Sequence, residues 1–205
     1  MAGLFITFEG GDGAGKSTQV AQLERRLRER GLEVVTSREP GGTELGQEIR
    51  QALLHGGHVS PRAEALLFAA DRAHHVASKI RPALERGAVV ISDRYLDSSV
   101  AYQGAARSLD LEQVRDLSLW AVEGLLPELT VLLDVPVSVE GDRLGSERDR
   151  LESEGGEFHQ RVRDEFLALA DREPERFFVV DGRGSIDEIA HKIWQRVEPL
   201  LARFA

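Results

Sequence analysis

The stretch at residues 10–17 constrains this chain more than any other part of it. It reads Gly-Gly-Asp-Gly-Ala-Gly-Lys-Ser, follows an apolar run at residues 4–8, and precedes a segment where Val20, Leu23 and Leu27 lie at helical spacing. Glycines in such a loop let successive backbone amides face phosphate oxygens, and the following helix adds the positive end of its dipole. The stretch therefore predicts a phosphate-binding loop between a buried strand and a helix, and with it nucleoside triphosphate binding.

Polar side chains in and near this loop have separate expected tasks. We expect Lys16 to reach the β- and γ-phosphates of ATP and the Ser17 hydroxyl to bind Mg²⁺. Asp93 ends another apolar run, at residues 89–92, and this position suits a carboxylate that holds Mg²⁺ through water. The expected ATP-binding residues of the loop are Gly10, Gly11, Asp12, Gly13, Ala14, Gly15, Lys16, Ser17 and Thr18.

Apolar runs alternate with segments of helical period along the rest of the chain. The expected strands are residues 4–8, 33–36, 88–92, 129–133 and 177–180, and the expected helices are residues 17–30, 45–54, 61–86, 98–106, 111–126 and 186–204. We therefore predict an α/β protein with the P-loop NTPase three-layer fold, in which helices flank a five-stranded parallel sheet. We expect a single domain over residues 1–205, with a charged, mobile lid at about 141–156.

Charge and composition exclude several classes of protein. Lysine and arginine number 26 against 35 aspartate and glutamate residues, and the net charge of −9 disfavours binding to nucleic acid or to an anionic membrane. The chain has no cysteine, which excludes thiolate metal sites and cysteine nucleophiles. It shows neither a secretory signal nor an apolar run long enough to span a bilayer, so we expect a cytoplasmic protein.

The lack of asparagine disfavours one class of nucleotide-binding protein, the GTPases of the Ras type. A GTPase of the Ras type would read guanine with an Asn-Lys-x-Asp motif, which this chain cannot form. A motor or an AAA-type ATPase would need a longer chain. A small kinase remains, in which phosphoryl transfer rests on positioning and on neutralisation of charge.

Five motifs, in the same order along the chain, resemble those of thymidylate kinase, and the resemblance extends from residue 4 to about 195. They are residues 8–10 (Phe-Glu-Gly), 38–43 (Arg-Glu-Pro-Gly-Gly-Thr), 67–74 (Leu-Phe-Ala-Ala-Asp-Arg-Ala-His), 93–95 (Asp-Arg-Tyr) and 101–104 (Ala-Tyr-Gln-Gly). The resemblance implies ATP-dependent phosphorylation of dTMP to dTDP with Mg²⁺, serving dTTP synthesis. The alternatives are a kinase for another small anionic acceptor, such as dUMP or CMP, and a regulatory ATPase without a second substrate.

Two arginines stand where parallel strands should end. Arg38 and Arg94 each follow an expected strand, at the edge where ligands bind in open α/β sheets, and two guanidinium groups there could grip a monophosphate. The resemblance implies that they hold the acceptor phosphate. Phe68 and Arg72 lie four residues apart and share a helix face. Spacing alone favours a core position for Phe68, whereas the resemblance implies that Phe68 stacks on the pyrimidine and Arg72 donates to thymine O4.

The resemblance also implies roles for residues near the sugar and the base. Tyr102 would pack under the sugar and disfavour a ribose 2′-hydroxyl, while Ser98 and Ser99 would face the base edge. Asp12 would orient an arginine or a metal-bound water. The implied substrate-binding set is Asp12, Arg38, Phe68, Arg72, Arg94, Ser98, Ser99, Tyr102 and Gln103.

The phosphate loop has no cation at Gly13, where some thymidylate kinases carry an arginine. The resemblance therefore implies the bacterial-type arrangement, in which an arginine of the lid supplies that charge. Arg148 and Arg150 are the expected phosphate-binding residues of the lid, and Arg143 is expected to stack on adenine; the alternative for each is a solvated, charged loop. The implied catalytic set is Asp12, Lys16, Arg38, Arg94, Arg148 and Arg150.

The two tryptophans, Trp120 and Trp194, lie on apolar helical faces, which favours core positions for both. Residues 111–126, with Trp120, Val122 and Leu125, could equally form a subunit contact. The resemblance implies a homodimer that forms through helix packing.

Overall fold

A five-stranded parallel sheet forms the centre of the computed structural model, which describes residues 3–139 and 149–204. The strands are β1 (Leu4–Glu9), β2 (Val34–Arg38), β3 (Val89–Asp93), β4 (Leu129–Asp134) and β5 (Phe177–Asp181). Their order across the sheet is β2-β3-β1-β4-β5, and every neighbouring pair is parallel. The predicted α/β fold with five parallel strands is confirmed.

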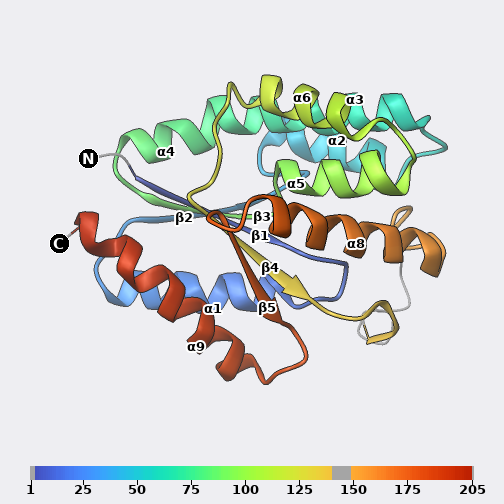
Figure 1. Cartoon of the computed structure of the whole chain (residues 1–205). Helices are drawn as coiled ribbons and strands as arrows, with labels where there is room; N and C mark the ends of the chain where they lie inside the picture. The colour runs from blue at the N-terminus through green and yellow to red at the C-terminus, as the bar shows by residue number, and fades with distance from the viewer. Residues whose placement is uncertain (1–2, 140–148, 205) are drawn as a thin grey trace.

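Helices form a layer on each face of the sheet (Figure 1). On one face lie α1 (Lys16–Glu29) and α9 (Ile186–Val197), which pack Leu27 and Trp194 against apolar strand residues. The other face carries α3 (Pro61–His75), the π-helical turn η1 (Val76–Ile80), α4 (Arg81–Glu85), α5 (Leu96–Ser99), the π-helical η2 (Val100–Ala106) and α8 (Gly156–Arg172). α2 (Glu44–Leu54) packs on α3, and α6 (Leu111–Ala121) packs on α3, α5 and η2. Over the described residues, none of these helices is both long and apolar enough to cross a membrane.

The helix α8 lies at residues for which no helix was predicted. Phe158, Val162, Phe166 and Leu169 are buried and recur at helical spacing, which is a signal that could have revealed it. The start of the helix is obscured because Gly155 stands at its N-cap, where a side chain that caps the first turn is the usual sign.

Several expected helices change type or end early because of local backbone chemistry. The helix expected at 61–86 is interrupted by η1 just before Pro82, whose nitrogen has no hydrogen to donate. The helix expected at 98–106 begins at Leu96 and continues as η2. The helix expected at 111–126 ends at Ala121, and the closing helix becomes the 3₁₀ turn η3 (Glu198–Phe204) after Val197.

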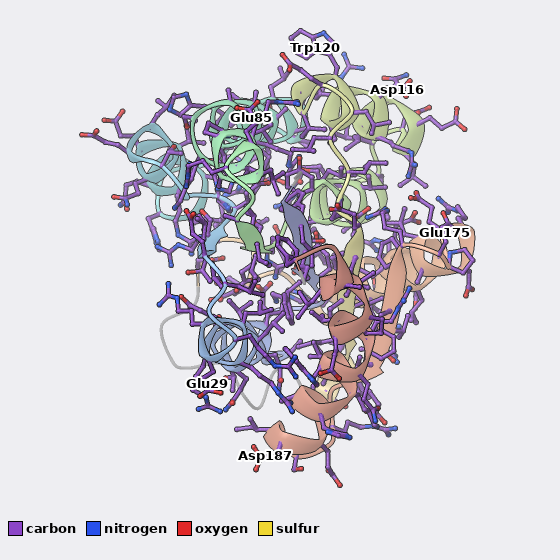
Figure 2. All side chains as sticks on the ribbon, turned by 90° about the vertical axis from the view of Figure 1, so that its left-hand side faces the viewer. Glu29, Glu85, Asp116, Trp120, Glu175 and Asp187 are labelled. Carbon is purple, nitrogen blue, oxygen red and sulfur yellow. The ribbon has the colours of Figure 1, made fainter. Side chains whose placement is uncertain are left out.

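Trp120 projects from α6 away from the body of the molecule (Figure 2). Its exposed fraction is 78%, whereas that of Trp194 is 4%. The expected core position is therefore correct for Trp194 and wrong for Trp120. Val122 is fully buried, which excludes it from a subunit contact, whereas Leu125 is partly buried against the same cluster.

The carboxyl ends of the strands meet at one edge of the sheet. In the register, Asp93 at the end of β3 lies opposite Phe8 of β1 and Arg38 of β2. The strand order reverses at β1, which lies between β3 and β4. A crevice at such a reversal is where ligands bind in open α/β sheets, and residues 10–15 leave β1 at this point.

Candidate active site

Residues 10–15 lead from β1 into the amino end of α1. Gly10 has a φ of 134°, and a side-chain carbon there would lie 2.5 Å from the carbonyl oxygen of Leu133, so only glycine fits. Gly15, with a φ of 95°, turns the chain into α1, whose first turn has no side-chain cap. Uncapped amides at the start of a helix can bind an anion. The loop geometry suits the phosphate-binding role that the sequence predicts.

Lys16 lies within this loop rather than in solvent. Its ammonium group donates to the carbonyl oxygens of Gly10 at 3.1 Å and Gly11 at 2.6 Å. Burial lowers the pKa of Lys16, and the charge of Arg94 lowers it further. A phosphate oxygen would replace neutral carbonyl partners with a charged one, which favours the ammonium form.

Ser17 and Asp93 stand together beside the loop. The Ser17 hydroxyl donates to Asp93 Oδ2 at 3.1 Å. A hydroxyl and a carboxylate oxygen are hard ligands that suit Mg²⁺, an ion that takes most of its remaining ligands from water and substrate phosphates. The pair therefore fits the expected metal. Within residues 3–139 and 149–204, no cluster of three or more histidine, aspartate or glutamate side chains forms a metal site without a substrate.

The carboxylate of Asp12, in the phosphate loop, binds the side chains of Arg94 and Tyr102. It accepts hydrogen bonds from Arg94 at 2.5 Å and from the Tyr102 hydroxyl at 2.8 Å. Burial alone would favour the neutral acid, but Arg94 and Lys16 outweigh it and lower the pKa of Asp12 to about 2. So acidic a carboxylate is a poor proton acceptor at neutral pH. Asp12 is therefore suited to orient Arg94 rather than to act as a general base.

Arg94 has a backbone conformation that is uncommon for a residue with a side chain. Its φ is 69°, and its amide donates to the carbonyl of Phe8 at 2.9 Å. The guanidinium group also donates to the carbonyl of Gly10 at 3.0 Å and to the hydroxyl of Ser98 at 3.1 Å. These bonds hold the strained residue and aim its guanidinium group across the phosphate loop.

Among the described residues, three guanidinium groups line the cavity around the phosphate loop. They belong to Arg38 at the end of β2, Arg50 on α2, and Arg94. Burial lowers the pKa of Arg50, and the positive charges of Arg38 and Arg94 lower it further. An anion among these three cations would relieve their mutual repulsion. Sequence analysis did not assign Arg50, because no spacing or motif distinguishes it from the other arginines.

A second pocket adjoins the one around the phosphate loop. Asp12, Glu39, Arg50, Arg94 and Glu152 line both pockets. The second pocket is also lined by Pro40, Leu54, Phe68, Arg72, Tyr95, Ser98, Ser99, Tyr102, Gln103, Asp149 and Leu151. The structure thus brings together the residues predicted to face the base and sugar, from α3, α5 and η2. A flat apolar ring beside a guanidinium group suits a pyrimidine base.

Arg72 uses most of its N–H groups within the protein. Its Nε donates to Glu39 at 2.7 Å, and Nη1 donates to the hydroxyls of Ser99 at 3.1 Å and Ser118 at 3.4 Å. Its Nη2 donates to the carbonyl of Tyr95 at 3.1 Å. A guanidinium group has five N–H bonds, so these four contacts leave one, on Nη2, for a ligand in the pocket.

Glu39, which itself lines the pocket, fixes Arg72 through the Nε hydrogen bond. Its other carboxylate oxygen lies 2.9 Å from Nδ1 of His75, whose Nε2 lies 2.7 Å from the hydroxyl of Ser37. Sequence analysis assigned no role to Glu39 or to His75. The contact between Glu39, just after β2, and His75, at the end of α3, forms only because the fold brings these two elements together.

Glu9 supports the start of α5 from inside the core. Its carboxyl group accepts hydrogen bonds from the Tyr95 amide at 2.8 Å and from the Ser98 hydroxyl at 2.6 Å. Burial and the nearby charge of Asp97 raise the pKa of Glu9 to about 8. Through Ser98 this group also fixes one partner of Arg94. In the sequence, Glu9 is recognisable only as part of the motif at residues 8–10.

Of the three arginines predicted for the lid, Arg143 and Arg148 lie outside the described residues. Arg150 is described, and its Nε donates to the carbonyl of Leu53 at 2.8 Å while its Nη2 donates to Glu64 at 2.6 Å. It lines neither pocket. The predicted role requires Arg150 to lie at the phosphate loop. In the structure its side chain instead binds Leu53 and Glu64.

Comparison with known proteins indicates one family. The family model described as thymidylate kinase matches residues 8–193. The chain is similar to thymidylate kinases of Leifsonia xyli subsp. xyli (64% identical, covering 96% of this chain and 95% of that protein) and Clavibacter sepedonicus (62%, covering 98% of each). It is also 52% identical to a thymidylate kinase of Synechococcus sp., over 97% of this chain and 96% of that protein.

Proposed function

The chain belongs to the thymidylate kinase family, and on that premise we propose how its residues transfer a phosphoryl group from ATP to dTMP, giving ADP and dTDP. The observation that carries the proposal is the cluster of Arg38, Arg50 and Arg94 where two pockets adjoin. One pocket is built on the phosphate loop, and the other is lined by Phe68 and Arg72. A kinase of a nucleoside monophosphate needs such a pair, with cations where the two phosphates meet.

The donor side consists of the phosphate loop and the residues that follow it. Backbone amides of residues 10–15, together with Lys16 and Thr18, bind the ATP phosphates. Ser17 and Asp93 hold Mg²⁺, which when bound neutralises charge on the phosphate oxygens. Because Gly13 supplies no cation, we assign that task to Arg148, and we place Arg143 beside adenine.

The acceptor phosphate binds between Arg50 and Arg94, which line both pockets. Arg38, which the sequence predicts to hold the same phosphate, lines only the pocket around the phosphate loop and would meet that phosphate from there. The second ionisation of a phosphate monoester has a pKa of about 6, so its attacking oxygen is already anionic at pH 7. The reaction therefore needs no general base. Asp12, ionised because its pKa is about 2, keeps the guanidinium group of Arg94 in line with the transferred group.

The base binds at the far end of the acceptor pocket. The ring of Phe68 stacks on the pyrimidine, and the remaining N–H of Arg72 donates to a carbonyl oxygen at position 4. Cytosine carries an amino group at that position, which would set two donors against each other and leave both without a partner. Tyr102 packs under the sugar, with Ser98, Ser99 and Gln103 around it.

The assembly and location of the protein complete the proposal. We infer a homodimer in which the exposed side chains of Trp120 and Leu66 are covered, because apolar groups of this size are costly to leave in water. We also place the protein in the cytoplasm, where it would meet both nucleotides.

A turnover assay over several acceptors tests the proposed function. The wild-type protein, ATP and Mg²⁺ are incubated with dTMP, dUMP, dCMP, AMP or the ribonucleotide TMP, and the nucleoside diphosphate formed is measured. We expect dTMP to be the best acceptor and dCMP to be rejected. Slow ATP hydrolysis that does not respond to any monophosphate would contradict the proposal and indicate a regulatory ATPase instead.

A further inference from the structure

Arg150 attaches its segment of the chain to the end of α2. Its backbone amide donates to the carbonyl of Leu54 at 3.2 Å, and its Nε donates to the carbonyl of Leu53 at 2.8 Å. The last carbonyl groups of a helix lack partners within the helix and accept readily from a cationic side chain. Arg150 therefore meets two of these acceptors at once.

The other end of the Arg150 guanidinium group binds a fully buried carboxylate, that of Glu64 on α3. Glu64 also accepts hydrogen bonds from Nε and Nη2 of Arg107, at 3.2 and 3.3 Å, and from Gln103 at 3.0 Å. Arg107 in turn pairs with Glu154 at 2.5 Å. Two arginines thus neutralise one buried carboxylate and tie residues 149–154 to α3 and η2.

The same segment forms a turn with its own internal bonds. The Asp149 carboxylate accepts from the amides of Leu151 at 2.8 Å and Glu152 at 2.9 Å, and the Asp149 amide donates to Glu152 at 3.0 Å. Leu151 is buried and packs in one cluster with Phe68 and Tyr102. Three of the four residues in the turn at 149–152, namely Asp149, Leu151 and Glu152, line the acceptor pocket.

We propose that Arg150 is a positioning residue, which holds the turn at residues 149–152 in place as a wall of the acceptor pocket. It sets the affinity for the nucleoside monophosphate through Leu151 and does not stabilise the transferred phosphoryl group. This inference rests on the proposed function of the pocket. It replaces the role that the sequence predicted for Arg150, whose contacts in the structure are with α2 and α3.

Steady-state kinetics separate the two roles. In Arg150→Met, which keeps side-chain length but removes every donor, we expect KM for dTMP to rise about 10-fold to 100-fold. We expect kcat to stay within about threefold and KM for ATP to be unchanged, because Asp149 and Leu151 line the acceptor pocket and not the pocket around the phosphate loop. A fall in kcat of about 10³-fold with KM for dTMP unchanged would overturn the proposal, since that is the effect of losing a transition-state arginine.

Two further variants keep the test independent of one substitution. Glu64→Gln removes the charge that holds Arg150, so it should raise KM for dTMP, and the double variant should be less than additive. Additive effects would overturn the proposal. Leu151→Ala should raise KM for dTMP with kcat retained, and an unchanged KM there would show that the turn is not a wall of the pocket.

A matched control and the wild-type rate complete the experiment. Arg86→Met removes an exposed arginine that pairs with Glu33 far from the pocket, and both kinetic constants should be unchanged. Thermal midpoints show that each variant is folded. Turnover of dTMP by the wild-type protein tests the proposed function alone, whereas the ratio of variant to wild-type constants tests Arg150.

Discussion

At the scale of single residues, the pKa of Arg50 depends on the charges beside it. Burial and two neighbouring arginines lower its pKa, so an anion that arrives nearby should stabilise its charged form. In Arg50→Met we expect kcat/KM for dTMP to fall about 10²-fold or more, because a charged partner of the acceptor phosphate is lost. Initial rates with dTMP varied at saturating ATP measure this loss.

A surface arginine provides the comparison for Arg50. Arg62 is exposed on α3, and Arg62→Met should leave kcat/KM unchanged. Equal losses in the two variants would mean that general charge, rather than a phosphate contact, explains the effect of Arg50.

Glu9 should make folding stability depend on pH in a particular window. Its pKa is raised from 4.5 to about 8, so the folded protein keeps a proton that the unfolded chain releases between these values. The contribution of Glu9 to stability therefore falls as pH rises from about 4.5 to about 8 and is level above that. In Glu9→Gln we expect stability like that of the wild type near pH 5 and higher relative stability at pH 8, measured by urea unfolding. Parallel pH profiles would contradict this.

A site residue can be predicted from the sequence where a local pattern fixes its chemistry. The loop at residues 10–17 has fixed spacing, and its geometry follows from the strand and helix beside it. Arg50 and Glu64 carry no such pattern, and the motif that contains Glu39 does not reveal its contact with Arg72. Their partners are more than nine residues away and meet them only through packing of α2, α3 and the turn near Arg150.

At the scale of secondary-structure elements, a buried ion pair joins the start of β5 to α5. Arg176 donates to the two carboxylate oxygens of Asp97 at 2.7 and 2.9 Å, and to Thr130 at 2.8 Å. Asp97 is fully buried, and Arg176 is 6% exposed. The pair therefore connects two elements whose own contacts are few.

Removal of Arg176 should leave a buried charge without a partner. We expect Arg176→Met to lower the free energy of unfolding by about 3–5 kcal/mol, because Asp97 cannot regain water. The double variant with Asp97→Asn should recover part of this loss. Guanidinium unfolding of the three variants measures both effects, and a loss in Arg176→Met no larger than that in the double variant would contradict the argument.

The strands were predicted to within one or two residues, because buried parallel strands read as continuous apolar runs. The π-helical turns η1 and η2 could not be predicted in this way. Pro82 lies in the first turn of α4, just after η1, but η2 contains no proline, and apolar spacing alone is nearly the same for the two helix types.

At the scale of the whole molecule, the proposed homodimer can be tested through its exposed apolar side chains. Trp120 and Leu66 are 78% and 58% exposed, and Trp120→Glu would place a charge in the interface. We expect the mass measured by light scattering to fall from that of a dimer to that of a monomer. Ile186→Glu, at an exposed apolar residue on α9, should leave the mass unchanged. A wild-type monomer would contradict the dimer.

The contrast between the two tryptophans has a practical consequence for measurement. Trp194 is buried with the guanidinium groups of Arg26 and Arg30 stacked on its ring, at 4.5 and 5.0 Å, while Trp120 lies on the surface of the single chain, where the proposed dimer would cover it. The two tryptophans are therefore fluorophores in opposite surroundings. In Trp120→Phe, excitation at a wavelength that tyrosine does not absorb would give emission from Trp194 alone, and this emission would follow unfolding of the α1–α9 layer. The difference from the wild-type spectrum would then report separately on whatever touches α6.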